Sequence, residues 1–227
     1  MVLKAVIFDF DGVIADSEPC HLAAFNRILA EFGIELTKEQ YYASYLGFTD
    51  YEVFENIRQN YKTDFNGRSV EHLANRKAEV FQKLIRQADH LIDGIAELIE
   101  ELKKNNIRIA VNSGAIAADI KIILDGTGLE NSFEVIVSAD DVEKGKPDPQ
   151  GYLLALKHLN ENSSTPILAA QCAAIEDSKW GIISAKKAGM HVVGITNSYP
   201  AKELAGSDLI IDSVRHLKIS DLHKLCS

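Results

Sequence analysis

The feature that most constrains this chain is a short apolar run near its start that ends in two acids and a glycine. Residues 4–8 read Lys-Ala-Val-Ile-Phe, and such a run is typical of a strand buried on both faces of a parallel sheet. Asp9 and Asp11 follow and project to the same side, because strand side chains alternate with a period of two. Gly12 allows a tight turn and a close approach to a ligand. The pattern predicts a ligand site at the carboxyl end of this strand.

The two aspartates are too close to tolerate each other's charge without compensation. Carboxylates crowded together repel each other unless a cation lies between them, and a hard divalent ion suits an oxygen-only ligand set. In the alternative interpretation the pair caps the next helix and begins a turn. Capping requires only one aspartate, but this short segment taken alone leaves both interpretations open.

Length and charge narrow the class of protein. The chain has 227 residues, enough for one large domain or two smaller ones. Its net charge of −9 argues against nucleic-acid and anionic-membrane partners. The chain enters its first strand without a signal peptide, and no apolar run is long enough to cross a bilayer. The three cysteines are too few for a disulfide framework. We expect a cytoplasmic protein, with a monomer as the default state.

A long all-helical stretch follows the first strand. Helical spacing of apolar residues predicts helices over 19–32, 50–61 and 69–87, and Thr37 with Gln40 forms a capping box that opens another. Gly33 and the pair at 66–67 have the character of a helix end and a turn. Without any strand pattern, residues 16–90 are expected to form a small all-α domain inserted after the first strand.

Beyond the helical stretch, strands and helices alternate. The pattern predicts strands over 107–111, 133–137, 172–175, 191–195 and 209–211, and helices over 95–104, 117–124, 149–159 and 180–188. Such alternation is typical of an α/β fold with a parallel sheet covered by helices. We therefore expect residues 1–15 and 91–227 to form a Rossmann-like core domain.

The next predicted strand also ends in a polar segment. Asn112, Ser113 and Gly114 offer a hydroxyl and backbone amides at a strand-to-helix turn, an arrangement that binds phosphate oxygens. Equally, Ser113 alone is a common choice as a helix N-cap. The segment predicts either a phosphate-binding turn or an ordinary helix start.

A lysine held between prolines follows further along the chain. Pro147 and Pro149 stiffen the segment around Lys146 and fix its direction. A positioned ammonium can offset the aspartates and hold a transferring phosphoryl group. Lys144 has the simpler interpretation of a solvated surface lysine.

A second acidic pair ends the predicted strand over 172–175. Glu176 and Asp177 must each be compensated if they are buried there. Together with Asp9 and Asp11 they make an oxygen-rich site suited to Mg²⁺. Helix capping is the alternative, and it becomes less attractive once all the strand ends are considered together.

These segments resemble the four motifs of the haloacid dehalogenase-like (HAD) phosphohydrolases, in the same order and spacing. The matching segments are Asp9-Phe10-Asp11-Gly12, Ser113, Lys146-Pro147-Asp148-Pro149 and Glu176-Asp177-Ser178. The resemblance covers nearly the whole chain, including a helical insertion where the family has its small α-helical cap. It is strongest to the branch that contains β-phosphoglucomutases, phosphoglycolate phosphatases and other sugar-phosphate phosphatases.

The resemblance implies a Mg²⁺-dependent phosphatase acting on a small phosphorylated metabolite, such as a sugar phosphate or phosphoglycolate. Asp9 would attack phosphorus and form an aspartyl-phosphate, and Asp11 would act as general acid and then general base. Ser113 would hold the phosphate, and Lys146 would stabilise the transition state. The implied Mg²⁺ ligands are Asp9, the backbone carbonyl of Asp11, Glu176 and Asp177.

The resemblance also implies a set of substrate-binding positions: Gly12, His21, Gly47, Lys77, Asn112, Gly114 and Ala115. Three of them, His21, Gly47 and Lys77, lie in the implied cap and would select the substrate. For Lys77 an exposed helical lysine is an equally good interpretation, and His21 also suits a surface or capping group.

The chain departs from the β-phosphoglucomutases at a position that matters for substrate choice. Those enzymes carry a cap-loop arginine that binds the second phosphate of the substrate. The matching residue here is Asp50, whose negative charge would repel a bisphosphate. Ala115 and Ile116 stand where the mutases have serine and lysine. These changes favour a phosphatase. The alternatives are a β-phosphoglucomutase-like phosphotransferase and an inactive HAD-fold binding protein.

Overall fold

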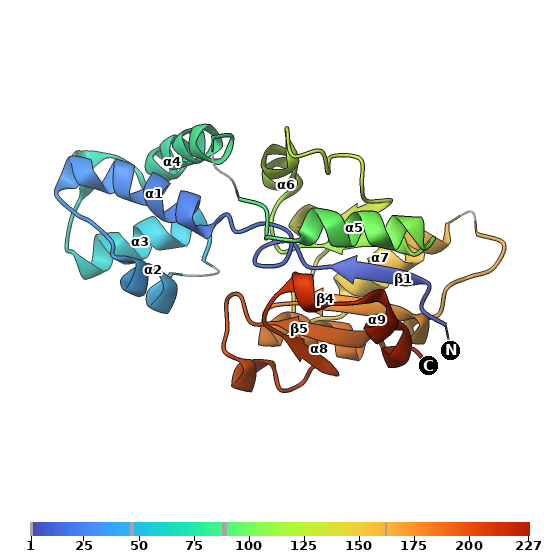
Figure 1. The fold of residues 1–227 in the computed structure, drawn as a ribbon. Helices are drawn as coiled ribbons and strands as arrows, with labels where there is room; N and C mark the ends of the chain where they lie inside the picture. The colour runs from blue at the N-terminus through green and yellow to red at the C-terminus, as the bar shows by residue number, and fades with distance from the viewer. Residues whose placement is uncertain (1, 46–47, 88–89, 162) are drawn as a thin grey trace. The chain divides into compact units, whose positions relative to one another are not determined.

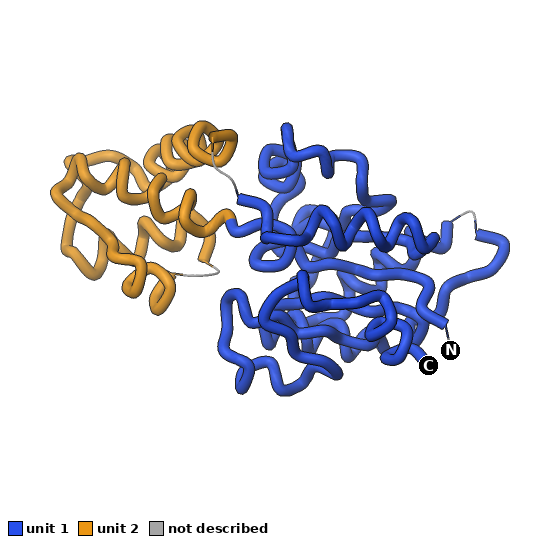
Figure 2. Tube along the Cα trace, viewed as in Figure 1, with its two compact units in different colours: residues 1–16, 90–227 blue, residues 17–89 orange. Residues whose placement is uncertain are grey.

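A computed structural model describes residues 2–45, 48–87, 90–161 and 163–227. The chain divides into two compact units, shown in different colours in Figure 2. Residues 1–16 and 90–227 form what we call the core unit, and residues 17–89 form the helical unit. Each boundary lies one residue from the position expected from the sequence.

The core unit is built on a sheet of six parallel strands in the order β3-β2-β1-β4-β5-β6 (Figure 1). The expected α/β fold is confirmed. The apolar run at the start of the chain forms β1, which lies in the middle of the sheet and is buried along its whole length. The strands are β1 (Ala5–Phe8), β2 (Arg108–Asn112), β3 (Val135–Val137), β4 (Cys172–Glu176), β5 (His191–Ile195) and β6 (Leu209–Ile211).

The register of the sheet brings the polar strand ends together. Phe8, the last residue of β1, is paired with Val111 in β2 and Ile175 in β4. The next residue on each of these strands is polar, so Asp9, Asn112 and Glu176 reach the same edge of the sheet. The backbone N–H of Asp9 continues the ladder by donating to the carbonyl of Ile175 at 2.9 Å.

Helices cover the sheet on both faces. Helices α7 (Gln150–Asn160) and α8 (Lys179–Lys187) pack against the face that carries Ile7 and Ala174. Helix α5 (Ile95–Lys104) contacts β2 in front of the sheet in the view of Figure 1. The remaining elements of the unit are α6 (Ala117–Leu124), α9 (Ile219–Leu225), and the 3₁₀ turns η3 (Ala139–Asp141), η4 (Ala169–Gln171), η5 (Ala201–Leu204) and η6 (Val214–His216). Across the described ranges, no helix has both the length and the apolar character needed to cross a membrane.

The helical unit contains no strand within its described residues, 17–45 and 48–87. Its elements are α1 (Glu18–Leu29), η1 (Ala30–Phe32), α2 (Lys38–Ser44), α3 (Asp50–Asn60), η2 (Phe65–Gly67) and α4 (Val70–Ile85). The predicted capping box is confirmed, since Thr37 and Gln40 exchange hydrogen bonds of 2.9 and 3.2 Å. Helix α1 is shorter than predicted, because the chain tightens into η1 before Gly33 closes the turn at a φ of 68°.

The two chain segments that lead into and out of the helical unit are joined to each other inside the core unit. The N–H of Asp16 donates to the carbonyl of His90 at 2.8 Å, and the N–H of Ile92 donates to the carbonyl of Ile14 at 2.9 Å. Ala15 forms an antiparallel bridge with Leu91 between these bonds. The insertion therefore begins and ends at one point of the core unit.

Candidate active site

Three buried carboxylates meet at the carboxyl ends of β1 and β4. Asp9, Glu176 and Asp177 each contribute an oxygen, and these oxygens lie within 4.8 Å of one another. Asp9 is held in place by the N–H of Phe10, which donates to its Oδ1 at 2.7 Å. The side chain of Asp11 is half-buried and is not a member of this acidic cluster. Two strands that are adjacent in the sheet thus supply the whole cluster.

Lys146 supplies positive charge to the cluster. Its Nζ lies 2.6 Å from Asp9 Oδ1 and 2.6 Å from Glu176 Oε1, and its side chain is 15% exposed. Burial by itself lowers the pKa of Lys146, but the two carboxylates more than offset this and raise the pKa above its ordinary value. The lysine is therefore an ammonium ion that bridges two acids, and its second partner is Glu176 where the sequence predicted Asp11.

One ammonium does not neutralise three carboxylates. Burial first, and repulsion from Asp9 second, raise the pKa of both Glu176 and Asp177 well above the usual range of a carboxyl group. Such shifts mean that the ionised forms are disfavoured where they stand. The cluster thus has an affinity either for protons or for a cation, and its all-oxygen donor set fits Mg²⁺.

Two glycines make room for the carboxylates. Gly12 has a φ of +75°, and a Cβ there would lie 1.8 Å from Asp177 Oδ2. A Cβ on Gly181 would lie 1.9 Å from Glu176 Oε1. The N–H of Gly12 donates to the carbonyl of Ala15 at 2.8 Å. Gly12, which the sequence places among the substrate-binding positions, therefore shapes the loop and leaves space for Asp177.

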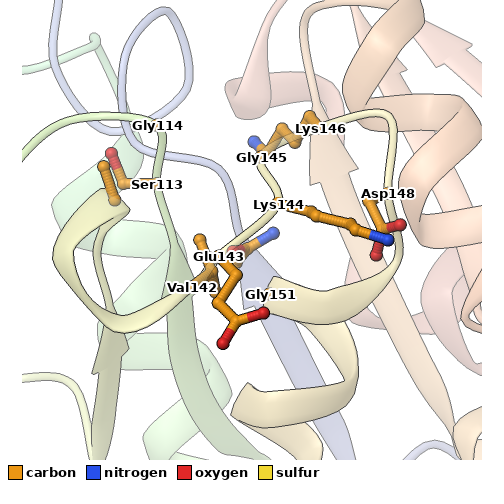
Figure 3. Close-up of a pocket in the computed structure, with 11 residues that line it drawn as sticks. Ser113, Gly114, Val142, Glu143, Lys144, Gly145, Lys146, Asp148 and Gly151 are labelled. Carbon is orange, nitrogen blue, oxygen red and sulfur yellow. The ribbon is translucent and has the colours of Figure 1, made fainter.

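A pocket of about 270 Å³ opens beside the cluster. Figure 3 shows Ser113 and Gly114 on one side of it and Lys144, Lys146 and Asp148 on the other. The predicted phosphate-binding turn and the bridging lysine therefore line the same pocket, whereas the three acids of the cluster are not among its lining residues. Lys144 is exposed, as its simpler interpretation requires.

Ser113 does not cap a helix. Helix α6 begins at Ala117 with Ile116 at its N-cap position, so the capping interpretation of Ser113 is wrong. The Ser113 Oγ instead accepts a hydrogen bond of 2.9 Å from the N–H of Ala115. Ala115 is among the substrate-binding positions that the resemblance implies, but its N–H is already used in this hydrogen bond within the turn. Asn112, also expected to bind substrate, is 4% exposed.

Lys77 is buried inside the helical unit, with 1% of its side chain exposed. Its Nζ lies 2.6 Å from His21 Nδ1 and 2.6 Å from Asp50 Oδ1, and over the ring of Phe25 at 4.5 Å. The interpretation of Lys77 as an exposed helical lysine is therefore wrong. His21 stacks on Phe81 at 4.0 Å between ring centres, so it is not a surface or capping group. Gly47 lies outside the described residues.

Neutral His21 makes the helical unit sensitive to acid. Burial, and to a lesser extent the charge of Lys77, lower the pKa of His21 from 6.5 to about 3. The unfolded chain therefore binds a proton between about pH 6.5 and pH 3 that the folded unit does not. We expect the unfolding free energy of the helical unit to fall with decreasing pH in this window, by up to about 1.4 kcal/mol per pH unit.

Amide hydrogen exchange of α1 and α4 between pH 7 and pH 5 measures this loss. The variant His21→Asn keeps a hydrogen-bond acceptor for Lys77 but has no titrating ring, so its exchange protection should depend less on pH. Equal pH dependence of the two proteins would contradict the prediction.

The site contains polar residues that the sequence analysis did not identify. Ser198 hydrogen-bonds to Asp177, and Asn197 Nδ2 donates to the carbonyl of Gly12 at 2.7 Å. They belong to the polar segment Thr196-Asn197-Ser198 that follows the apolar strand β5, so applying the rule for strand ends to this strand would have found them. Tyr152 donates to Glu176 from within α7. Its helical spacing in the sequence is that of an ordinary core residue, so nothing there indicates a role in the site. Asp50 pairs with Lys77, and its position in the sequence predicts only a departure from the mutases.

Comparisons with known proteins agree with this geometry. The family model described as haloacid dehalogenase-like hydrolase matches residues 6–195. The β-phosphoglucomutase of Bacillus subtilis is 32% identical over 98% of this chain and 95% of its own. A phosphorylated carbohydrates phosphatase of Thermotoga maritima is 30% identical over 86% of this chain and 87% of its own.

A solved structure extends the likeness to three dimensions. A variant of CbbY from Rhodobacter sphaeroides in complex with xylulose-(1,5)bisphosphate superposes with a TM-score of 0.79. It is 28% identical and the match covers 96% of each chain. With three strand ends that supply the acids and the hydroxyl of the family, and with Lys146 bonded to two of those acids, the protein belongs to the haloacid dehalogenase-like hydrolases and is a phosphohydrolase of the branch shared by β-phosphoglucomutases and sugar-phosphate phosphatases.

Proposed function

We propose that this protein is a Mg²⁺-dependent phosphatase that hydrolyses a small phosphorylated, sugar-like metabolite through an aspartyl-phosphate. The observation that carries the proposal is the Lys146 ammonium, 2.6 Å from the buried Asp9 and lining the same pocket as Ser113. A nucleophile, a fixed positive charge and a pocket with room for a phosphate ester are the parts that phosphoryl transfer requires.

Each residue has a chemical task in this proposal. Asp9 attacks phosphorus, and the bond to the leaving alkoxide breaks while Asp11 gives that oxygen a proton. The half-buried Asp11 carboxylate then takes a proton from the water that hydrolyses the aspartyl-phosphate. Ser113 and the Gly114 amide hold phosphate oxygens, and Lys146 offsets the charge that builds up on the phosphoryl group.

The acidic cluster fits the metal that the family implies. Asp9 and Asp177, with Glu176 beside them, place buried oxygens within 4.8 Å of one another, and Lys146 leaves part of their charge uncompensated. When bound, Mg²⁺ would neutralise these carboxylates and the phosphate and so favour the attack of one anion on another. Glu176 contributes mainly charge, because Lys146, Tyr152 and Ser178 already contact its oxygens.

The ion pair in the helical unit favours a phosphatase over a mutase. The resemblance to β-phosphoglucomutases would require a cap arginine for a second phosphate, and Asp50 stands at that position. Asp50 also neutralises the buried Lys77 at 2.6 Å, so this pair offers a second phosphate no net positive charge. The 32% identity to a β-phosphoglucomutase keeps the phosphotransferase as the second candidate.

Phosphate release from a panel of small esters tests the proposal. The panel contains sugar monophosphates, phosphoglycolate, xylulose bisphosphate and β-glucose 1-phosphate, each with Mg²⁺ and with EDTA. We expect release that depends on Mg²⁺, stops with EDTA and returns when Mg²⁺ is added in excess. Release that continues unchanged in EDTA would contradict the metal requirement.

The other outcomes separate the remaining candidates. Glucose 6-phosphate formed from β-glucose 1-phosphate, without free phosphate, would identify a mutase despite Asp50. No turnover of any ester would favour an inactive binding protein. Preference for a bisphosphate would contradict the argument from the Lys77–Asp50 pair while leaving the phosphatase chemistry intact.

A further inference from the structure

Tyr152, on α7, joins the hydrophobic core to the acidic cluster. Its side chain is fully buried and packs in the core with Ala155 and Ile182. Its hydroxyl donates to Glu176 Oε1 at 2.6 Å. A buried hydroxyl is unfavourable unless it is hydrogen-bonded, and phenylalanine would fill the same space without this requirement. The contribution of the hydroxyl therefore lies in its bond to Glu176.

Glu176 in turn fixes the position of Lys146. Its Oε1 accepts from both the Tyr152 hydroxyl and the Lys146 ammonium, each at 2.6 Å. Ser178 Oγ lies 3.3 Å from the other oxygen, and Gly181 packs so closely that a Cβ there would overlap the carboxylate. These contacts fix the Glu176 carboxylate, and the fixed carboxylate holds Lys146 in the position from which it reaches Asp9.

The hydroxyl of Tyr152 also faces the phosphate-binding turn. The side chain of Asn112 lies beside it, and a Cβ on Gly151 would come within 2.1 Å of Asn112 Oδ1. Asn112 directly precedes Ser113 in the chain. Tyr152 thus lies between the segment that would hold the phosphate and the carboxylate that holds Lys146.

We propose that Tyr152 is a positioning residue that acts through Glu176 to hold the Lys146 ammonium beside Asp9. This inference rests on the proposed phosphatase function. The charge of Lys146 acts on the phosphoryl group mainly as it is transferred, so a small displacement of the ammonium weakens the transition state more than the bound substrate. Ser113 and Gly114 remain in place to bind the ester.

The variant Tyr152→Phe separates this role from simple packing. We expect kcat to fall about 10–100-fold, the range for residues that orient a catalytic group, with KM changed less than about twofold. Tyr41→Phe is the matched control, because the Tyr41 hydroxyl also donates to a glutamate, Glu18, at 2.7 Å. It should lower the melting temperature to a similar degree and leave kcat unchanged.

A double-mutant cycle tests whether Tyr152 acts through Glu176. Glu176→Met removes the shared acceptor at similar length, and adding Tyr152→Phe to it should cause no further loss of kcat. Independent, additive losses would overturn the proposal. So would a lower melting temperature in Tyr152→Phe with unchanged kcat.

A readout without turnover keeps this inference distinct from the proposed function. If the wild-type protein hydrolyses no ester, the phosphatase proposal fails, but the position of Lys146 can still be probed with acetic anhydride. Mass spectrometry should show faster acetylation of Lys146 in Tyr152→Phe than in the wild type or Tyr41→Phe. Equal acetylation of Lys146 in all three proteins would overturn the positioning role.

Discussion

Replacing Asp9 by asparagine should abolish phosphate release while leaving the protein folded. Asparagine keeps the size of the side chain but is too weak a nucleophile to form the acyl-phosphate. We expect kcat to fall by at least about 10⁴-fold, as when other covalent enzymes lose their nucleophile. Because Asp9 raises the pKa of both Glu176 and Asp177 by repulsion, its loss should maintain or raise the midpoint of urea unfolding.

Excess-enzyme phosphate release and urea unfolding measure these two effects. Asp221→Asn is the matched control, because Asp221 on α9 also pairs with a lysine, Lys224, at 3.2 Å, and it should match the wild type in turnover. If Asp9→Asn retained full turnover, the proposed mechanism would be wrong. If it failed to fold, the buried Asp9 would be needed for structure, contrary to the repulsion argument.

Replacing Lys146 by methionine should reduce both turnover and stability. Loss of a fixed charge at the developing phosphoryl group is expected to lower kcat by about 10²–10³-fold. Removal of the ammonium also leaves Asp9 and Glu176 buried without their partner, and breaking a buried ion pair on one side destabilises by about 3–5 kcal/mol. Because the lysine side chain is 15% exposed, we expect the loss of unfolding free energy to lie near the lower end of this range.

Kinetics at saturating substrate and urea unfolding at neutral pH test this variant. Lys157→Met, at an exposed position of α7, is the control and should affect neither quantity. Full turnover in Lys146→Met would remove the lysine from the mechanism. A normal unfolding midpoint would show that protons or bound cations already balance the two acids.

The strand ends could be predicted from the sequence because two simple rules apply to them. A run such as 4–8 must be buried on both faces, and polar residues directly after such runs collect at one edge of a parallel sheet. These rules were sufficient to bring Asp9, Ser113 and Glu176 together. The segment around Lys146 follows no strand, and its place depended on its prolines and on the family resemblance.

Residues whose partners lie on a different helix or strand could not be predicted in this way. Tyr152 has the spacing of a core residue, and only the crossing of α7 behind the sheet brings its hydroxyl to Glu176. Lys77 and Asp50 are separated along the chain and lie on different helices, so their ion pair appears only when α3 and α4 are packed together. A helical pattern shows which face is apolar, and it does not show which polar group on another helix it will meet.

The joined segments at Asp16 and His90 have a consequence for how such a protein can change over time. Hydrogen bonds and a bridge in the core unit clamp the two ends of the insertion. The entropy of closing an inserted loop grows only with the logarithm of its length, by about 0.6 kcal/mol for each doubling. The sheet and its acidic cluster can therefore accept a larger, smaller or unrelated insertion whose ends lie close together. In the proposed function the helical unit selects the substrate and the core unit carries out phosphate transfer, so these two properties would be free to evolve separately.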